Sequence, residues 1–305
     1  MTEDLETVIA IPPLPFRGGV FDREAQRKNV RYLIHRNFMA GRRRRAIGIA
    51  GTSLVHHVRE EDLLEVMRIT GEAAAQEAVI IAGLVATPPP RARLFLQQCM
   101  NLDRPPDYFL LMPIPGVCNP DGIESEFTAL ARDFGDRLGA RFILYMRSSD
   151  LLDAYIRTIA SSPHVVGVKV GTRAEDIALM RSALPSDKKV LWGVGDRATE
   201  AARLGSRGHT SGITLICPRA CDDIFNAYRR GDFDAAVRME EVVAEFEEIR
   251  FMESRAYNYS AVVAAAQLAG FTDIDLGDGG PFNAAPPPSI LARLAQCVDR
   301  LKPYH

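Results

Sequence analysis

A single lysine stands inside an apolar segment of the chain. Residues 165–172 read VVGVKVGT, and Lys169 is the only charged residue among them. If this segment is a buried strand, burial disfavours the ammonium form, which lowers the lysine pKa and frees a neutral amine to attack a carbonyl group. The alternative is a lysine whose stem packs in the wall while its amine reaches a carboxylate. The pattern alone leaves both interpretations open.

Two further segments place polar groups where they could assist such a lysine. Tyr145 lies near the end of the apolar segment 142–146, FILYM. Its hydroxyl could pass protons to and from an intermediate on Lys169, although a core tyrosine with a satisfied hydroxyl has the same pattern. The segment 51–53, Gly51-Thr52-Ser53, offers small hydroxyls and backbone amides that suit a carboxylate. A plain turn explains these three residues equally well.

The remaining motifs are weaker. The turn 193–196, GVGD, is a common type of glycine turn and is little evidence for a phosphate site. His56 and His57 are adjacent, and adjacent side chains of an extended segment point to opposite faces, so we expect no metal site there. The chain has no H-E-x-x-H, Walker or G-x-S-x-G motif, which excludes the usual zinc protease, nucleotide-binding and serine hydrolase classes. We expect no cofactor.

Short apolar runs alternate with longer amphipathic segments along most of the chain. This alternation is typical of parallel strands joined by crossover helices, and runs that are apolar throughout indicate strands buried on both faces. We predict eight strands, over Thr7–Ile11, Ala46–Gly51, Val79–Leu84, Tyr108–Met112, Phe142–Met146, Val165–Val170, Val190–Val194 and Gly212–Ile216.

After the predicted eighth strand the alternation ends. The segments Asp222–Tyr228, Phe233–Ser254, Tyr257–Leu268 and Ser289–Leu301 all have helical patterns, with no strand between them. We therefore predict an α/β fold, a (β/α)8 TIM barrel over residues 1–231, followed by a C-terminal helical extension over residues 232–305. In such a barrel the active site lies at the carboxyl ends of the strands, which is where Lys169 and Tyr145 stand.

Composition and charge limit the class of protein. Of the 305 residues, 47% are hydrophobic and 25% charged, as in globular proteins, and the net charge of -2 gives no reason to expect nucleic acid. The basic run 42–45, RRRR, is expected to be a solvated loop. The acidic amino terminus does not resemble a secretory signal, and no apolar stretch approaches the roughly 20 residues of a membrane span. We expect a cytoplasmic protein with free thiols and no membrane partner.

Taken together, these segments resemble the dihydrodipicolinate synthase and N-acetylneuraminate lyase family of pyruvate-dependent, Schiff-base aldolases. The segment 161–180, SSPHVVGVKVGTRAEDIALM, is similar to the family's segment around its Schiff-base lysine, ILYM to the strand with its catalytic tyrosine, and AGTS to its carboxylate-binding motif. The resemblance implies catalytic roles for Lys169, Tyr145 and Thr52. It also implies substrate binding by further residues, namely Gly51, Ser53, Gly195 from WGVGD and Ile213 from SGIT.

The chain departs from the family pattern in three places. Leu54 and Val55 stand where the motif continues with glycine and glutamate. Ile114 and Pro115 stand where the family commonly has two tyrosines, one of which completes a proton relay across a subunit interface. Residues 147–150 read RSSD, with no arginine at the place that matches the one whose side chain holds the second substrate's carboxylate in the synthase. Arg147, His56 and His57 are candidates to replace these groups, and Arg147 is included among the predicted substrate-binding residues.

The residues implied to handle pyruvate are kept, whereas those that receive a second substrate are changed. We therefore expect a Schiff-base lyase acting on pyruvate or a related 2-oxo acid, by aldol cleavage, dehydration or condensation, and we do not expect a true lysine-biosynthesis synthase. A non-catalytic barrel that binds a 2-oxo acid is the alternative, and a phosphate-binding barrel is a weaker third. The resemblance also implies a homo-oligomer, a tetramer or a dimer.

Overall fold

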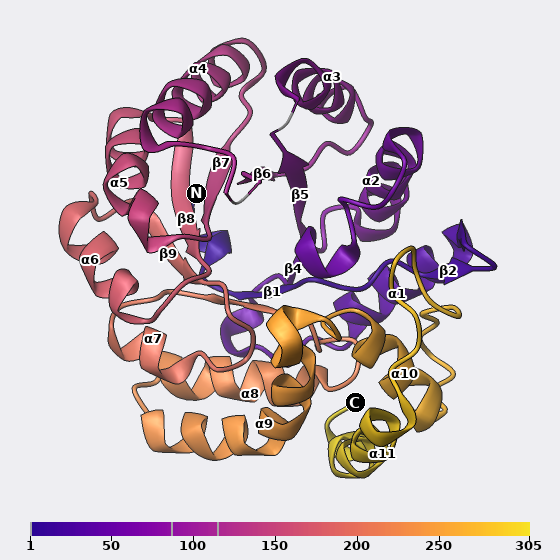
Figure 1. Ribbon diagram of the computed structural model, residues 1–305. Coiled ribbons are helices and arrows are strands. Elements are labelled where there is room, and N and C mark those ends of the chain that lie inside the picture. Colours follow the sequence, from indigo (N-terminus) through magenta and orange to yellow (C-terminus); the bar gives the residue numbers. More distant parts are fainter. Residues whose placement is uncertain (1, 87, 115) are drawn as a thin grey trace.

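Eight parallel strands close into a barrel with helices around its outside (Figure 1). The structure, a computed structural model, describes residues 2–86, 88–114 and 116–305. Neighbouring strands follow the order β1-β10-β9-β8-β7-β6-β5-β4, and β1 pairs with β4 to complete the ring. The predicted (β/α)8 barrel is therefore confirmed. Its strands are β1 (Val8–Ala10), β4 (Ala46–Ile49), β5 (Val79–Val85), β6 (Tyr108–Met112), β7 (Phe142–Met146), β8 (Val165–Val170), β9 (Lys189–Trp192) and β10 (His209–Ser211).

Burial explains why these segments form strands. The residues of β6, β7 and β8 are all buried, as expected for parallel strands that face the barrel interior on one side and the helices on the other. These three strands begin and end at the predicted residues. A separate antiparallel pair of two-residue strands, β2 (Phe16–Arg17) and β3 (Val20–Phe21), was not predicted.

The eighth barrel strand is not where the apolar pattern placed it. We predicted Gly212–Ile216, but β10 is His209–Ser211 and ends before Gly212. The strand is polar because its side chains have buried partners: the Ser211 hydroxyl donates to Asp196 at 2.7 Å, and His209 Nδ1 lies 3.0 Å from the Tyr228 hydroxyl. An apolar-run criterion cannot find a strand whose buried polar groups are satisfied by distant residues.

Among the described residues, eight α-helices accompany the barrel strands, and three further α-helices follow the barrel. The barrel helices are α1 (Arg23–His35), α2 (Glu60–Ala74), α3 (Pro89–Met100), α4 (Pro120–Leu138), α5 (Leu152–Ser161), α6 (Glu175–Ala183), α7 (Thr199–Arg203) and α8 (Pro218–Arg229). The later helices are α9 (Phe233–Arg255), α10 (Ser260–Ala269) and α11 (Pro288–Leu301). The 3-10 turns are η1 (Glu3–Leu5), η2 (Ala40–Arg42), η3 (Gly51–Ser53), η4 (Ser149–Leu151) and η5 (Lys302–Tyr304). None of the described helices is long and apolar enough to cross a bilayer.

The later helices lie along one side of the barrel (Figure 1). Helix α9 packs against α8, and α11 packs against both α9 and α10. The carboxyl end of α9 departs from helical geometry at Met252, Glu253 and Ser254, and this break turns the following residues toward the barrel. The five cysteines are free thiols. The division into residues 1–231 and 232–305 stays a prediction.

The basic run at 42–45 is not wholly the solvated loop that we expected. Arg45 is fully buried at the amino end of β4 and forms two hydrogen bonds to Asp222, of 2.7 and 2.6 Å. It also donates to the backbone carbonyls of Leu33 and Arg36. These four hydrogen bonds from the guanidinium, two of them to a carboxylate, offset the free-energy cost of burying the charge. The expectation of a solvated loop is therefore wrong for Arg45, which belongs to the core.

Candidate active site

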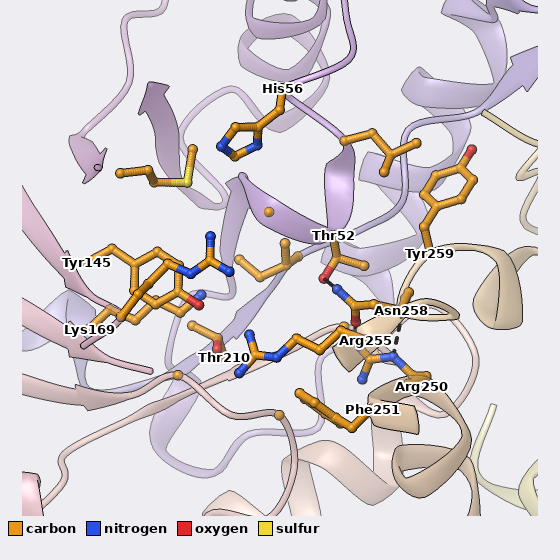
Figure 2. Close-up of a pocket in the computed structure, with 18 of the residues that line it drawn as sticks. Thr52, His56, Tyr145, Lys169, Thr210, Arg250, Phe251, Arg255, Asn258 and Tyr259 are labelled. Atoms are coloured by element: carbon orange, nitrogen blue, oxygen red, sulfur yellow. Dashed lines mark hydrogen bonds between the residues drawn. The ribbon is translucent and has the colours of Figure 1, made fainter. Parts of the chain in front are cut away.

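A cavity of about 340 Å³ opens at the carboxyl ends of the barrel strands. Lys169 and Tyr145 line it from β8 and β7, and Gly51 and Thr52 line it from the turn after β4. The opposite wall comes from the residues around the end of α9 (Figure 2). The cavity therefore joins barrel and extension, and the structure brings together six of the eight predicted site residues there, the further two being Arg147 and Gly195.

Lys169 and Tyr145 are neighbours because their strands pair in register. Tyr145 of β7 is the direct partner of Lys169 on β8, and the Lys169 ammonium lies 4.2 Å from the centre of the tyrosine ring. Glycines leave room for both side chains. A Cβ atom at Gly193 would lie 2.9 Å from Lys169 Cε, and one at Gly171 would lie 2.5 Å from the Tyr145 ring. Any larger residue at either glycine would displace a candidate catalytic group.

The surroundings of Lys169 favour its neutral amine. The side chain is 6% exposed and stands above an apolar interior that includes Ile81, Leu110 and Ile143. Burial lowers the pKa of Lys169, the cations of Arg255 and Arg147 lower it further, and Tyr145 opposes them. A lysine amine with a lowered pKa in a cavity is suited to nucleophilic attack on a carbonyl carbon.

Tyr145 is placed to exchange protons with the same centre. Burial alone would raise its pKa, but the positive charges of Lys169, Arg255 and Arg147 outweigh burial, so that the pKa of Tyr145 is lowered. The hydroxyl of Tyr155 donates to the Tyr145 carbonyl at 2.8 Å and supports the strand from outside the barrel. A tyrosine with a lowered pKa is a better proton donor than an ordinary phenol.

A chain of hydrogen bonds ties Thr52 to the helical extension. The Asn258 amide donates to the Thr52 hydroxyl at 3.2 Å, and Arg250 donates to the Asn258 side-chain oxygen at 2.6 Å. Arg250 is in turn paired with the buried carboxylate of Glu247. Because the Thr52 oxygen already accepts a hydrogen bond, its own proton is available to a bound anion. Figure 2 shows this chain running from α9 to the turn after β4.

The other predicted substrate-binding residues do not all reach the cavity. Gly51, Gly195 and Arg147 are among its lining residues, whereas Ser53 and Ile213 are not. The Ser53 hydroxyl donates instead to the Pro12 carbonyl at 2.6 Å, so that it fixes the turn. The roles assigned to all five remain predictions.

Residues at the three departures from the family pattern lie at or near the cavity. Leu54, His56 and His57 line it, whereas Ile114 lines a neighbouring depression beside His56. Pro115 lies outside the described residues. Partial burial lowers the pKa of His56, and the nearby charge of Arg147 adds to that effect. Within the described part of the chain, no three His, Cys, Asp or Glu side chains are grouped so as to hold a metal ion.

Sequence reasoning missed the wall that the extension supplies. Arg250, Phe251, Arg255, Asn258 and Tyr259 all line the cavity from the end of α9 and the turn after it. Nothing in the helical pattern of this region indicates which residues face the barrel, because that depends on how the extension docks. The break at the end of α9 is equally invisible, since left-handed backbone at three successive non-glycine residues has no sequence signature.

Comparisons with known proteins agree with the fold and the order of these segments. The Dihydrodipicolinate synthetase family matches residues 119–276, just over half of the chain. Among curated relatives, the 4-hydroxy-tetrahydrodipicolinate synthase of Alkalilimnicola ehrlichii is 25% identical over 229 residues, covering 74% of this chain and 77% of the relative. That of Anaplasma marginale is 24% identical over 199 residues, and the match spans 64% of its length.

Solved structures of the same kind share the fold. Dihydrodipicolinate synthase from Bacillus clausii superimposes with a TM-score of 0.87 at 20% sequence identity, covering 98% of both chains. A chloride-inhibited dihydrodipicolinate synthase from Acinetobacter baumannii, complexed with pyruvate, gives a TM-score of 0.83 at 23% identity, covering 97% of this chain and 98% of the other.

Proposed function

The chain belongs to the dihydrodipicolinate synthetase family, a family of lyases, and from this premise we propose that it is a Schiff-base-forming lyase acting on pyruvate or a related 2-oxo acid. The observation that carries the proposal is the position of Lys169. Its amine is buried at the carboxyl end of the barrel, its pKa is lowered, and it lies 4.2 Å from the ring of Tyr145 beside an accessible cavity.

The proposed reaction begins with attack of the neutral Lys169 amine on the 2-oxo carbon. Tyr145 donates a proton to the departing hydroxyl, which leaves as water, and the imine forms. The Thr52 hydroxyl donates a hydrogen bond to the substrate carboxylate, and the backbone around Gly51 adds amide donors. The protonated imine is an electron sink, so that a bond on the adjacent carbon can break or form through an enamine.

The departures from the family pattern favour an activity other than lysine-biosynthesis synthase. After Tyr145 no arginine stands at the position that matches the one in the synthase, and Ile114 stands where the family commonly has a tyrosine. A positioned proton donor contributes roughly 10²–10⁴ in rate. We therefore expect condensation of pyruvate with aspartate semialdehyde at or near background, measured as consumption of the aldehyde. Robust turnover there would reverse this part of the proposal.

Imine trapping tests the proposal directly. Protein incubated with pyruvate and borohydride should acquire a stable secondary amine on the peptide that contains Lys169, detected by mass spectrometry. Lys169→Ala should abolish that label. Tyr145→Phe should slow labelling by at least roughly 10²-fold while leaving the fold intact, because only a hydroxyl is removed.

Lys188 offers a matched control. It is also 6% exposed, and burial lowers its pKa as well, but its amine donates to the carbonyls of Ser162 and Val165 at 2.7 Å, and it does not line the cavity beside Lys169. Lys188→Met should keep the label on Lys169. If labelling survives Lys169→Ala, or is absent with every 2-oxo acid, the lyase hypothesis fails and the hypothesis of a non-catalytic binding barrel takes its place. Labelling of Lys169 without release of pyruvate from any substrate would also favour the non-catalytic barrel.

We further propose a cytoplasmic homo-oligomer. The support for this proposal is the resemblance to the dihydrodipicolinate synthase family, since most soluble oligomers are closed, symmetric homo-oligomers. Sedimentation of a monomer alone at high protein concentration would contradict the oligomer.

A further inference from the structure

Two arginines that line the cavity are not neutralised by the protein. Arg147 follows β7 and Arg255 ends α9, and neither forms an ion pair with a carboxylate anywhere in the described ranges. Their near neighbours are aromatic: the Arg147 guanidinium lies 5.7 Å from the Tyr145 ring centre, and that of Arg255 lies 5.0 Å from the Phe251 ring centre. Arg250, by contrast, is paired with Glu247 beside them.

The described residues that line the cavity have an excess of positive charge. Its described lining holds Lys169 and three arginines and contains no aspartate or glutamate. Glu247 offsets Arg250, and a 2-oxo acid bound as proposed would bring one carboxylate for Thr52 and Gly51. Arg147 and Arg255 then remain without a counter-charge. Arg255 is partly buried and Arg147 is exposed, and cations gathered along the wall of one cavity attract an anion.

The extension holds Arg255 in place before any ligand arrives. Backbone φ values of 48°, 57° and 75° at Glu253, Ser254 and Arg255 are left-handed, a conformation that non-glycine residues rarely adopt. The break turns the Arg255 side chain into the cavity, toward the side where Tyr145 and Lys169 lie (Figure 2). Strain of this kind persists where the surrounding packing imposes it, and Phe251 supplies a ring on which the guanidinium rests.

We propose that the cavity takes a 2-oxo acid with a second carboxylate at its far end, which Arg255 and Arg147 bind together. This inference rests on the proposed imine at Lys169 and adds the class of substrate. A guanidinium presents two parallel N–H donors that match the two oxygens of a carboxylate, so one arginine on each side of the cavity can hold such a group. The two arginines come from different parts of the chain, and Arg255 in particular from the extension.

Matched pairs of ligands separate charge from size. We would measure the concentration for half-maximal borohydride trapping with 2-oxoglutarate against 2-oxopentanoate, and with 2-oxoadipate against 2-oxohexanoate. Each pair differs by a terminal carboxylate in place of a methyl group. For at least one pair the wild type should favour the dicarboxylate by tenfold or more, and Arg255→Gln and Arg147→Gln should each reduce that ratio by at least roughly fivefold.

Arg238→Gln is the control variant. Arg238 is exposed on α9 and does not line the cavity, so its replacement removes the same charge from the same helix and should leave the ratio unchanged. The dicarboxylate assignment would be overturned if both members of each pair were trapped equally, or if Arg255→Gln and Arg147→Gln both kept the wild-type preference. Labelling of Lys169 by pyruvate would then still support the proposed imine. Absence of all labelling would instead remove the imine on which the inference depends.

Discussion

At the amino end of the barrel Arg45 is fully buried and forms two hydrogen bonds to Asp222, whereas at the carboxyl end Arg147 and Arg255 meet no carboxylate among the described residues. The lysines differ in the same way. Lys188 donates to two backbone carbonyls, and Lys169 faces a cavity. A buried charge with a complete set of partners is part of the structure, whereas a charge that lines a cavity without a carboxylate partner is open to an anionic ligand.

The largest effect that tests this comparison is a loss of stability at the amino end. Asp222→Ala should lower the free energy of unfolding by about 3–5 kcal/mol, because it leaves the Arg45 guanidinium buried without its counter-charge. It also removes the acceptor for the Phe38 amide, which donates to Asp222 at 2.8 Å. Urea unfolding at fixed protein concentration measures the loss.

Asp223 provides the control for that measurement. It is the next residue on α8 but is only partly buried, and no ion pair with Arg45 involves it. Asp223→Ala should cost less than about 1 kcal/mol. Pairing Asp222→Leu with Arg45→Met should restore much of the stability, since an apolar pair no longer buries a lone charge. If the unfolding free energies of Asp222→Ala and wild type agreed within about 1 kcal/mol, the Arg45–Asp222 pair would not be a structural interaction, and the contrast with the cavity arginines would be lost.

The same contrast explains which parts of the structure could be predicted from the sequence. The strands β6, β7 and β8 were found at their exact limits because burial on both faces leaves an uninterrupted apolar run. Consecutive strands of a barrel are neighbours, so that Lys169 and Tyr145 could be placed side by side. Strand β10 was misplaced because its polar residues depend on Asp196, which lies elsewhere in the chain.

The extension's share of the site could not be predicted in this way. Arg255 reaches the cavity through the break at the end of α9 and through the packing of α9 on α8, and neither has a local pattern. Arg45 was misjudged for a related reason. A run of four arginines has the composition of a solvated loop, and only Asp222, 177 residues further along the chain, distinguishes the buried member from its neighbours.

A smaller effect should appear at the carboxyl end without a change in stability. Thr52→Val removes the hydroxyl that we expect to donate to the substrate carboxylate. Hydrogen bonds to charged groups contribute about 1.5–3 kcal/mol, so the pyruvate concentration for half-maximal trapping should rise by tenfold to roughly a hundredfold. Thr52→Ser keeps the hydroxyl and should behave like wild type. Unchanged trapping by Thr52→Val would show that the Asn258–Thr52 hydrogen bond has only a structural role.

The smallest effect is a shift in the pH profile of imine formation. The reaction needs the neutral amine, so its rate rises with pH through the pKa of Lys169 and then levels off until the proton donor Tyr145 is itself deprotonated. Because burial, with Arg255 and Arg147, lowers that pKa, the plateau should be reached below the ordinary lysine range. Arg255→Gln removes one of the lowering charges, which raises the Lys169 pKa and should move the midpoint to higher pH.

Tyr145→Phe should move the same midpoint in the opposite direction. Tyr145 acts to raise the pKa of Lys169, so that its replacement leaves the amine neutral at lower pH even though the plateau rate falls. Arg238→Gln, an exposed change on the same helix as Arg255, should leave the midpoint unchanged. Trapping rates measured across the pH range give midpoint and plateau separately. If Arg255→Gln lowered the midpoint, or if Arg255→Gln and Tyr145→Phe moved it in the same direction, the charge of Arg255 would not lower the pKa of Lys169, and this prediction would be wrong.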